Sequence, residues 1–265
     1  MSRRALGALA AVAGGALLLA GCSSAAPEPG SSPASSPSEE ALTGSITVLA
    51  AASLTETFDA LGAAFEAEHP GTTVTFSYGG SSSLAQQIVS GAPADVFAAA
   101  NESTMQTVDD AGLAVDPTIF ATNVLELVVP PGNPGGVTGL ADLARPELAI
   151  ALCDVAVPCG SATQQLLDQE GITAQPDTLE QDVKLVLTKV QLGEADAGLV
   201  YVTDAATAGD AVEGIAIPEA QSVVNRYPIA TIDGSPNAAL AAAFVAFVLS
   251  EEGRAALAEA GFGAP

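Results

Sequence analysis

Residues 46–56 read ITVLAAASLTE, an apolar strand that passes directly into a helix, and residues 74–84 read VTFSYGGSSSL, which repeats this arrangement. In both stretches hydroxyl side chains stand where the strand gives way to the helix. Backbone N–H groups at the start of a helix lack partners within the helix and lie at the positive end of its dipole. Both turns therefore favour binding of a small anion through neutral donors.

The charge balance of the chain is strongly acidic. Seven Lys and Arg residues stand against 31 Asp and Glu residues, for a formal net charge of −24. Such a surface argues against binding to nucleic acid or to anionic lipid head groups. An anion site in this protein is therefore expected to depend on local hydroxyl and amide donors, because basic side chains are scarce.

The N-terminus has the features of an export signal. Arg3 and Arg4 precede a small and apolar run from Ala5 to Ala20, and Gly21-Cys22 completes a lipoprotein processing box. The run is shorter than the roughly 20 residues that a transmembrane helix usually needs. Residues 1–21 are therefore predicted to be a lipoprotein signal peptide. Lipidated Cys22 is expected to anchor the protein to the outer face of the cell membrane, which makes it extracytoplasmic.

The folded body is expected to begin near Gly44, because residues 22–43 are mostly Ser, Pro, Ala and Glu and read as a disordered tether. Strand-like and helix-like runs alternate from there. The expected strands are residues 46–50, 74–78, 95–100, 124–129, 148–152, 198–202, 215–218 and 228–232. The expected helices are residues 54–68, 84–90, 102–111, 162–170, 181–192 and 238–249. This order predicts an α/β fold with parallel sheets and a ligand at the carboxyl ends of the strands.

Two domains are predicted from this alternation. Domain I comprises residues 44–123 and 228–265, and domain II comprises residues 124–227. Each is expected to be a Rossmann-like α/β domain, and the length of the body suits two such units. Because the chain crosses between them twice, the crossings act as a hinge and a ligand cleft is expected between the domains.

Cys153 and Cys159 remain once Cys22 is assigned to lipid. Outside the cytoplasm this pair is expected to form a disulfide. A pair of free buried thiols and a metal site are the alternatives. A metal site needs further ligands, and the only histidine, His69, lies far away in the sequence. No metal ligated directly by the protein is predicted.

Six segments of the body resemble molybdate-binding proteins, the extracytoplasmic solute receptors of ABC importers. The segments are ITVLAAASLT at 46–55, SSSLAQQI at 81–88, GAPADVF at 91–97, QDV at 181–183, GLVY at 198–201 and YPIA at 227–230. The resemblance extends over residues 44–265. It implies the fold of type II periplasmic binding proteins, in which two α/β domains enclose the ligand.

The resemblance also implies a set of neutral donors for a tetrahedral oxyanion. Ser53 is expected to offer its hydroxyl and its N–H, Ser81 its hydroxyl, Cys159 and Val183 their backbone N–H groups, and Tyr201 its hydroxyl. The sequence departs from the family pattern at Gly79-Gly80, in the turn before Ser81, and at Cys159 itself. If Cys159 is bonded to Cys153, the disulfide stiffens the loop that presents this N–H.

Each of these residues also has a structural explanation. Ser53 and Glu56 have the spacing of a capping box, which stabilises the start of a helix without any ligand. Residues 81–83 fit a solvated turn, the Val183 side chain belongs to an apolar helix stripe, and Tyr201 fits a buried strand tyrosine with a satisfied hydroxyl.

The function that the resemblance implies is capture of molybdate or tungstate and delivery to an ABC permease, without chemistry and without a cofactor. A monomer is expected. A site made only of donors disfavours hydrogen phosphate, whose proton finds no acceptor, whereas sulfate must be excluded by cavity size. The alternatives are a receptor for another small anion such as sulfate, and an enzyme on a similar two-domain scaffold. No His lies near the motifs to act as a base for an enzyme.

Overall fold

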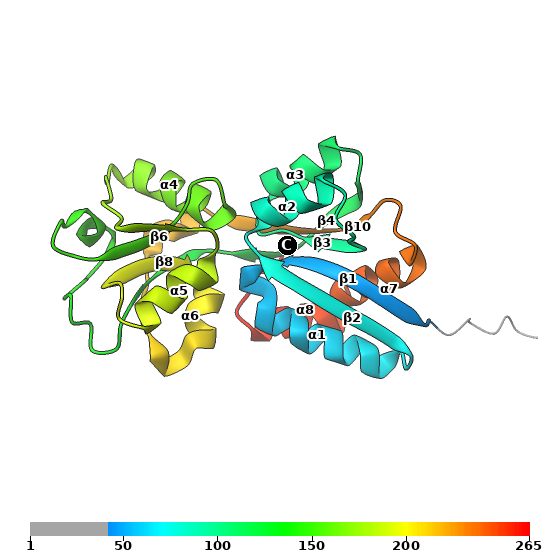
Figure 1. Ribbon diagram of the computed structural model, residues 1–265. Coiled ribbons are helices and arrows are strands. Elements are labelled where there is room, and N and C mark those ends of the chain that lie inside the picture. The colour runs from blue at the N-terminus through cyan, green and yellow to red at the C-terminus, as the bar shows by residue number, and fades with distance from the viewer. Residues whose placement is uncertain (1–41) are drawn as a thin grey trace, which may run out of the picture. The chain divides into compact units, whose positions relative to one another are not determined.

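A computed structural model describes residues 42–265, which belong to one compact unit containing two five-stranded sheets (Figure 1). The predicted signal peptide, the lipidation site Cys22 and nearly all of the predicted tether lie outside the described residues. Each sheet with its helices is called a lobe below. The predicted α/β fold class, with two sheets that each pack against helices, is confirmed.

The first lobe is built on a sheet with the strand order β2-β1-β3-β10-β4. Its strands are β1 (Gly44–Ala51), β2 (Thr72–Gly79), β3 (Val96–Ala98), β4 (Ala114–Asn123) and β10 (Asn225–Ile232). Its helices are η1 (Ala52–Leu54), α1 (Thr55–Glu68), α2 (Ser81–Val89), α3 (Glu102–Asp110), α7 (Ala238–Val248) and α8 (Glu251–Glu259). Helices α2 and α3 cover one face of the sheet, and α1, α7 and α8 cover the other (Figure 1).

The second lobe has the strand order β7-β6-β8-β5-β9. Its strands are β5 (Leu125–Val129), β6 (Ile150–Cys153), β7 (Thr178–Glu180), β8 (Ala197–Tyr201) and β9 (Glu213–Ile215). Its helices are η2 (Leu140–Ala144), α4 (Pro158–Glu170), α5 (Val183–Gln191), α6 (Val202–Ala208), η3 (Gly209–Ala211) and η4 (Pro218–Ser222). The chain enters this lobe between β4 and β5 and leaves it between β9 and β10.

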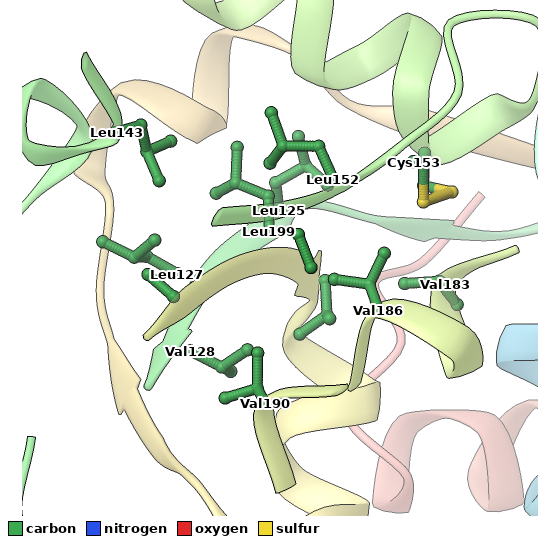
Figure 2. Packing of buried hydrophobic residues seen from close by; sticks show 14 of the residues in the cluster. Leu125, Leu127, Val128, Leu143, Leu152, Cys153, Val183, Val186, Val190 and Leu199 are labelled. Carbon is green, nitrogen blue, oxygen red and sulfur yellow. A yellow bond between two sulfur atoms is a disulfide. The ribbon is translucent and has the colours of Figure 1, made fainter. Parts of the chain in front are cut away.

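Both lobes have apolar cores that the strand and helix patterns anticipate. In β1, Val48 and Ala50 contribute to the cluster under α1 and α7, whereas Leu49 contributes to the cluster under α2, as alternation along a strand requires. In the second lobe, α5 packs on β5 and β8 (Figure 2). Its buried side chains Val183, Val186 and Val190 belong to the same cluster as Leu127 and Leu199. Burial of each such side chain stabilises the fold by roughly 1.5–3 kcal/mol.

The sheets are mixed and not parallel, which corrects the sequence-based expectation. β1 runs parallel to β2 and β3, but β10 runs antiparallel to β3 and β4. In the second sheet β5 runs antiparallel to β8 and β9. The antiparallel strands are those next to the crossings, because a strand that returns from the other lobe enters its sheet from the opposite end.

Several elements were missed by the sequence patterns. Strand β4 contains Pro117 and has Asp116 at a φ of 49°, and such interruptions are tolerated because β4 lies at the edge of its sheet. Strand β10 begins at Asn225 and not at Pro228, where the ladder is irregular and the proline has no N–H to donate. Strand β7 and helices α6 and α8 were also not expected. No helix in the described part of the chain is both long enough and apolar enough to cross a membrane.

Candidate functional site: a cavity at four helix starts

A small cavity of about 20 Å³ lies between the lobes. All five residues implied by the resemblance line it: Ser53, Ser81, Cys159, Val183 and Tyr201. The remaining lining residues are Ala51, Ala52, Gly79, Gly80, Ala100, Val157, Pro158 and Asp182. Segments from both lobes that are far apart in the sequence therefore line the same small cavity.

Helix starts supply most of this lining. Helices α2 and α4 begin without a side-chain cap, and Pro158 at the first position of α4 has no N–H of its own. The next amide in α4 is that of Cys159. In α5 the Asp182 carboxylate accepts a hydrogen bond from the Leu185 N–H at 3.0 Å, and the N–H of Val183 at the first position has no acceptor within the helix. Two helix starts from each lobe thus direct backbone amides toward the cavity, counting the η1–α1 start at Ser53.

Ser53 and Ser81 are both buried and hydrogen-bonded within the protein. The Ser53 Oγ lies 3.0 Å from the Tyr227 Oη, and the Glu56 carboxylate accepts a hydrogen bond from Lys184. Neither side chain caps helix α1, so the capping-box interpretation is wrong. The Ser81 Oγ accepts a hydrogen bond from the Ala100 N–H at 3.0 Å. Ser81 is only 1% exposed, which excludes the solvated-turn interpretation at this residue.

Tyr201 stands at the end of β8 and is 1% exposed. Burial raises the pKa of its hydroxyl well above the ordinary value, so the side chain stays protonated and able to donate. The Asn225 Nδ2 donates to the Tyr201 Oη at 3.0 Å. The interpretation of Tyr201 as a buried strand tyrosine is therefore correct, and the residue also lines the cavity.

No Lys or Arg lines the cavity within the described residues. Lys184, which follows Val183, has its Nζ 2.9 Å from Glu56 Oε2 and 3.1 Å from Asp204 Oδ1. Asp204 is fully buried, and that burial raises the pKa of its carboxyl to about 6, while Lys184 acts in the opposite direction. The ammonium group nearest in sequence to the cavity is therefore already paired with two carboxylates.

Direct contacts hold the two lobes together around the cavity. The Ser82 hydroxyl of the first lobe donates to the Ala156 carbonyl of the second at 2.6 Å. The Lys184–Glu56 ion pair is a second contact between the lobes. At Gly80 the backbone comes so close that a Cβ there would lie 2.1 Å from the Gln181 carbonyl oxygen. The departure from the family pattern at Gly80 thus has a steric reason in this chain.

Replacement of Gly80 by Ala is expected to hold the lobes apart and to lower the affinity for a ligand bound between them by about tenfold or more, because the closing contact must overcome a backbone clash. Gly79→Ala is the matched control, since a Cβ at Gly79 meets only the Leu84 side chain at 3.7 Å. Isothermal titration on both variants tests this. An affinity of Gly80→Ala equal to that of Gly79→Ala would contradict the prediction.

A disulfide joins Cys153 and Cys159, as expected. It connects the end of β6 with the first turn of α4 and so constrains the loop that presents the Cys159 N–H to the cavity. Within the described residues no group of three or more His, Cys, Asp or Glu side chains is placed to hold a metal ion.

The sequence patterns missed four residues at this site: Ala100, Asp182, Asn225 and Tyr227. Asp182 lies within the QDV segment and Tyr227 begins the YPIA segment, but neither was assigned a role. Asn225 and Ala100 carry no local signal, since their partners lie 19 or more residues away in the sequence.

The chain is similar to known extracellular receptors along most of its length. A family profile described as bacterial extracellular solute-binding protein matches residues 46–263. The molybdate-binding protein ModA of Mycobacterium tuberculosis is 47% identical over 236 residues, which cover 88% of this chain and 90% of that protein.

Two solved structures share the fold. The periplasmic molybdate-binding protein of Azotobacter vinelandii superposes with a TM-score of 0.72 at 24% identity, covering 83% of this chain and 99% of its own. The sulfate-binding protein SubI of Mycobacterium tuberculosis gives a TM-score of 0.72 at 23% identity, covering 82% of this chain and 86% of its own. Because the two scores are equal, the fold does not distinguish between these anions.

Proposed function

Because the chain belongs to the bacterial extracellular solute-binding proteins, we propose that it captures molybdate in the cavity between its lobes. The observation that carries this proposal is the convergence of four helix starts and three hydroxyls on a cavity without Lys or Arg. Helix N-termini and neutral donors favour a small oxyanion. The 47% identity to a molybdate-binding protein, along nearly the whole of both chains, favours molybdate over sulfate.

The proposed donors are the hydroxyls of Ser53, Ser81 and Tyr201 and the backbone N–H groups of Ser53, Cys159 and Val183. Hydrogen bonds to a charged acceptor are shorter and roughly twice as strong as neutral ones. Closure of the lobes excludes water from the cavity and strengthens these bonds further. Neutral donors thereby offset the acidic character of the whole chain at this one place.

We propose that the same donor set governs selectivity. The proposed donors are hydroxyls and amides, and the carboxylate in the lining, Asp182, already accepts from the Leu185 N–H at 3.0 Å, so the proton of hydrogen phosphate is disfavoured. Sulfate has no proton but is smaller, and donors from two lobes that fit the larger molybdate are expected to hold it less well. Tungstate matches molybdate in charge and shape and is expected to bind comparably.

The protein is proposed to act as a binding receptor and not as an enzyme, with no cofactor. It hands its cargo to an ABC-type permease, works as a monomer and is held at the outer face of the membrane by lipidated Cys22. The membership in an extracellular family supports this location. The processing box at residues 19–22 is the basis for the anchor.

Calorimetric titration of the purified protein with molybdate, tungstate, sulfate and phosphate tests the proposal. Molybdate and tungstate are expected to bind tightly, sulfate at least about 100-fold more weakly, and phosphate not measurably, because differential fit and an unaccepted proton each cost a few kcal/mol. Sulfate binding equal to molybdate binding would make this a general sulfate-type receptor. Binding of neither anion would refute the proposed function.

A further inference from the structure

We propose that Asn225 is a positioning residue of the oxyanion site, which holds the Tyr201 hydroxyl as an acceptor and so leaves its proton for the bound anion. The inference rests on the proposed function. It extends that function by identifying what sets the direction of a donor whose proton is otherwise free to rotate.

The orientation of the Asn225 amide is determined by a backbone group. Its Nδ2 lies 3.0 Å from the Ala100 carbonyl oxygen and 3.0 Å from the Tyr201 Oη. A carbonyl oxygen only accepts hydrogen bonds, so the amide nitrogen and not the amide oxygen must face Ala100. The two protons of the nitrogen are thereby assigned, one to Ala100 and one to Tyr201.

A tyrosine hydroxyl has one proton. Since the Tyr201 Oη accepts from Asn225, its own proton points away from Asn225 and faces the cavity that Tyr201 lines and the neighbouring Tyr227 hydroxyl. Of these two acceptors the bound anion is the stronger, because a hydrogen bond to a charged acceptor is roughly twice as strong as a neutral one. Both side chains are buried, at 1% exposure for Tyr201 and 5% for Asn225, so bulk water does not compete for these bonds. In such surroundings a hydrogen bond is stronger and its loss costs more than at a surface.

The Ala100 peptide group has the same effect on a second donor. Its N–H donates to the Ser81 Oγ at 3.0 Å, and an N–H cannot accept in return. Ser81 therefore also retains its proton for the cavity. Ser53 differs, because its partner is the Tyr227 hydroxyl, and either group of that pair can donate. Asn225 and Ala100 thus each donate to one of the three hydroxyls and keep the proton of that hydroxyl from pointing at them. Ser53 provides an internal comparison.

Asn225 also connects the two lobes. It is the first residue of β10, where the chain returns to the first lobe, and it links Ala100 after β3 with Tyr201 at the end of β8. The Tyr201 donor is therefore correctly oriented only when both lobes are in the arrangement that forms the cavity. Donor geometry and lobe closure are coupled through this one side chain.

A double-mutant cycle on molybdate affinity tests the inference, using Asn225→Leu, Tyr201→Phe and the double variant. Asn225→Leu is expected to lower the affinity about tenfold or more in the wild-type background. In the Tyr201→Phe background it is expected to change the affinity by less than about threefold, because the hydroxyl through which it acts is gone. As a control, Asn225→Leu combined with Ser53→Ala is expected to show additive losses, since Asn225 does not contact Ser53.

The outcomes separate this inference from the function on which it rests. Equal losses from Asn225→Leu with and without the Tyr201 hydroxyl would show that Asn225 is merely structural and would overturn the inference alone. Failure of the wild type to bind any oxyanion would refute both. If circular dichroism shows that Asn225→Leu does not fold, the cycle is run with the smaller Asn225→Ala. This variant removes the amide without adding a charge near the anion, so the same loss and the same dependence on Tyr201 are expected.

Discussion

Replacement of both Ser53 and Ser81 by Ala is expected to lower molybdate affinity by about 100-fold to 10,000-fold. Each hydroxyl is buried, lines the cavity and is proposed to donate to a charged acceptor. Removal of one such hydrogen bond costs roughly 1.5–3 kcal/mol, and every 1.4 kcal/mol changes affinity about tenfold. The measurement is calorimetric titration of the double variant beside the wild type.

The control for this experiment is Ser83→Ala with Ser90→Ala. Ser83 and Ser90 are exposed, lie in or directly after α2, and do not line the cavity. The Ser83→Ala and Ser90→Ala double variant removes the same number of hydroxyls. Its affinity for molybdate is expected to equal that of the wild type. If the Ser53 and Ser81 variant stays folded and still binds molybdate with wild-type affinity, the proposed donor set is wrong.

Replacement of Lys184 by Met is expected to lower the free energy of unfolding by about 3 kcal/mol at pH 7.5. Its Nζ lies 3.1 Å from Asp204 Oδ1, and Asp204 is fully buried. Removal of one partner leaves a buried carboxylate without compensation, which typically costs 3–5 kcal/mol, and partial exposure of Lys184 places this pair at the lower end. Urea unfolding monitored by circular dichroism measures the change.

The loss of unfolding free energy in Lys184→Met is expected to depend on pH, and this dependence identifies Asp204 as its cause. The pKa of Asp204 is already raised to about 6 by burial, above its value in the unfolded chain, so folding favours the protonated form. This carboxyl therefore contributes least to stability above pH 6, and stability is gained as the pH falls from about 6 toward 4. Loss of Lys184 raises the pKa of Asp204 further. The deficit of Lys184→Met is thus expected to be largest above pH 6 and to shrink by pH 5.

Lys189→Met is the matched control for Lys184→Met. Lys189 lies in the same helix α5 and pairs with Glu180 at 3.4 Å, and both side chains retain some exposure. Such a pair contributes about 1 kcal/mol or less. A deficit in Lys184→Met that is no larger than that in Lys189→Met, or one that does not change with pH, would contradict the role assigned to the Lys184–Asp204 pair.

Local patterns were sufficient to predict the elements that line the cavity between the lobes. The strand–helix turns at Ser53 and Ser81 follow from apolar runs that end in small hydroxyl residues, and the structure places both turns on one cavity. The Val183 stripe predicted a buried helix face, and Val183 is buried. Its N–H remains available because the first amide of any helix lacks an internal acceptor.

Among the elements that sequence patterns missed or misdirected, strands β4 and β10 depend on distant partners. Strand β4 is interrupted by Pro117, and it forms because β10 pairs with it after an excursion through the whole second lobe. The direction of β10 was likewise mispredicted, because alternation of strands and helices does not show from which end a returning strand enters its sheet.

The sequence by itself determined the α/β class, the cysteine pair and the strand–helix turns at Ser53 and Ser81, because periodicity, helix starts and short spacings are properties of neighbouring residues. The full set of candidate donors came from the resemblance to a known family. The tertiary structure alone decided which residues meet at the cavity and which contacts hold them there. The Ser53–Tyr227 contact joins residues 174 positions apart, and the Lys184–Glu56 ion pair joins residues 128 positions apart. Such contacts exist only once two lobes have folded and met, so no local pattern in the chain encodes them.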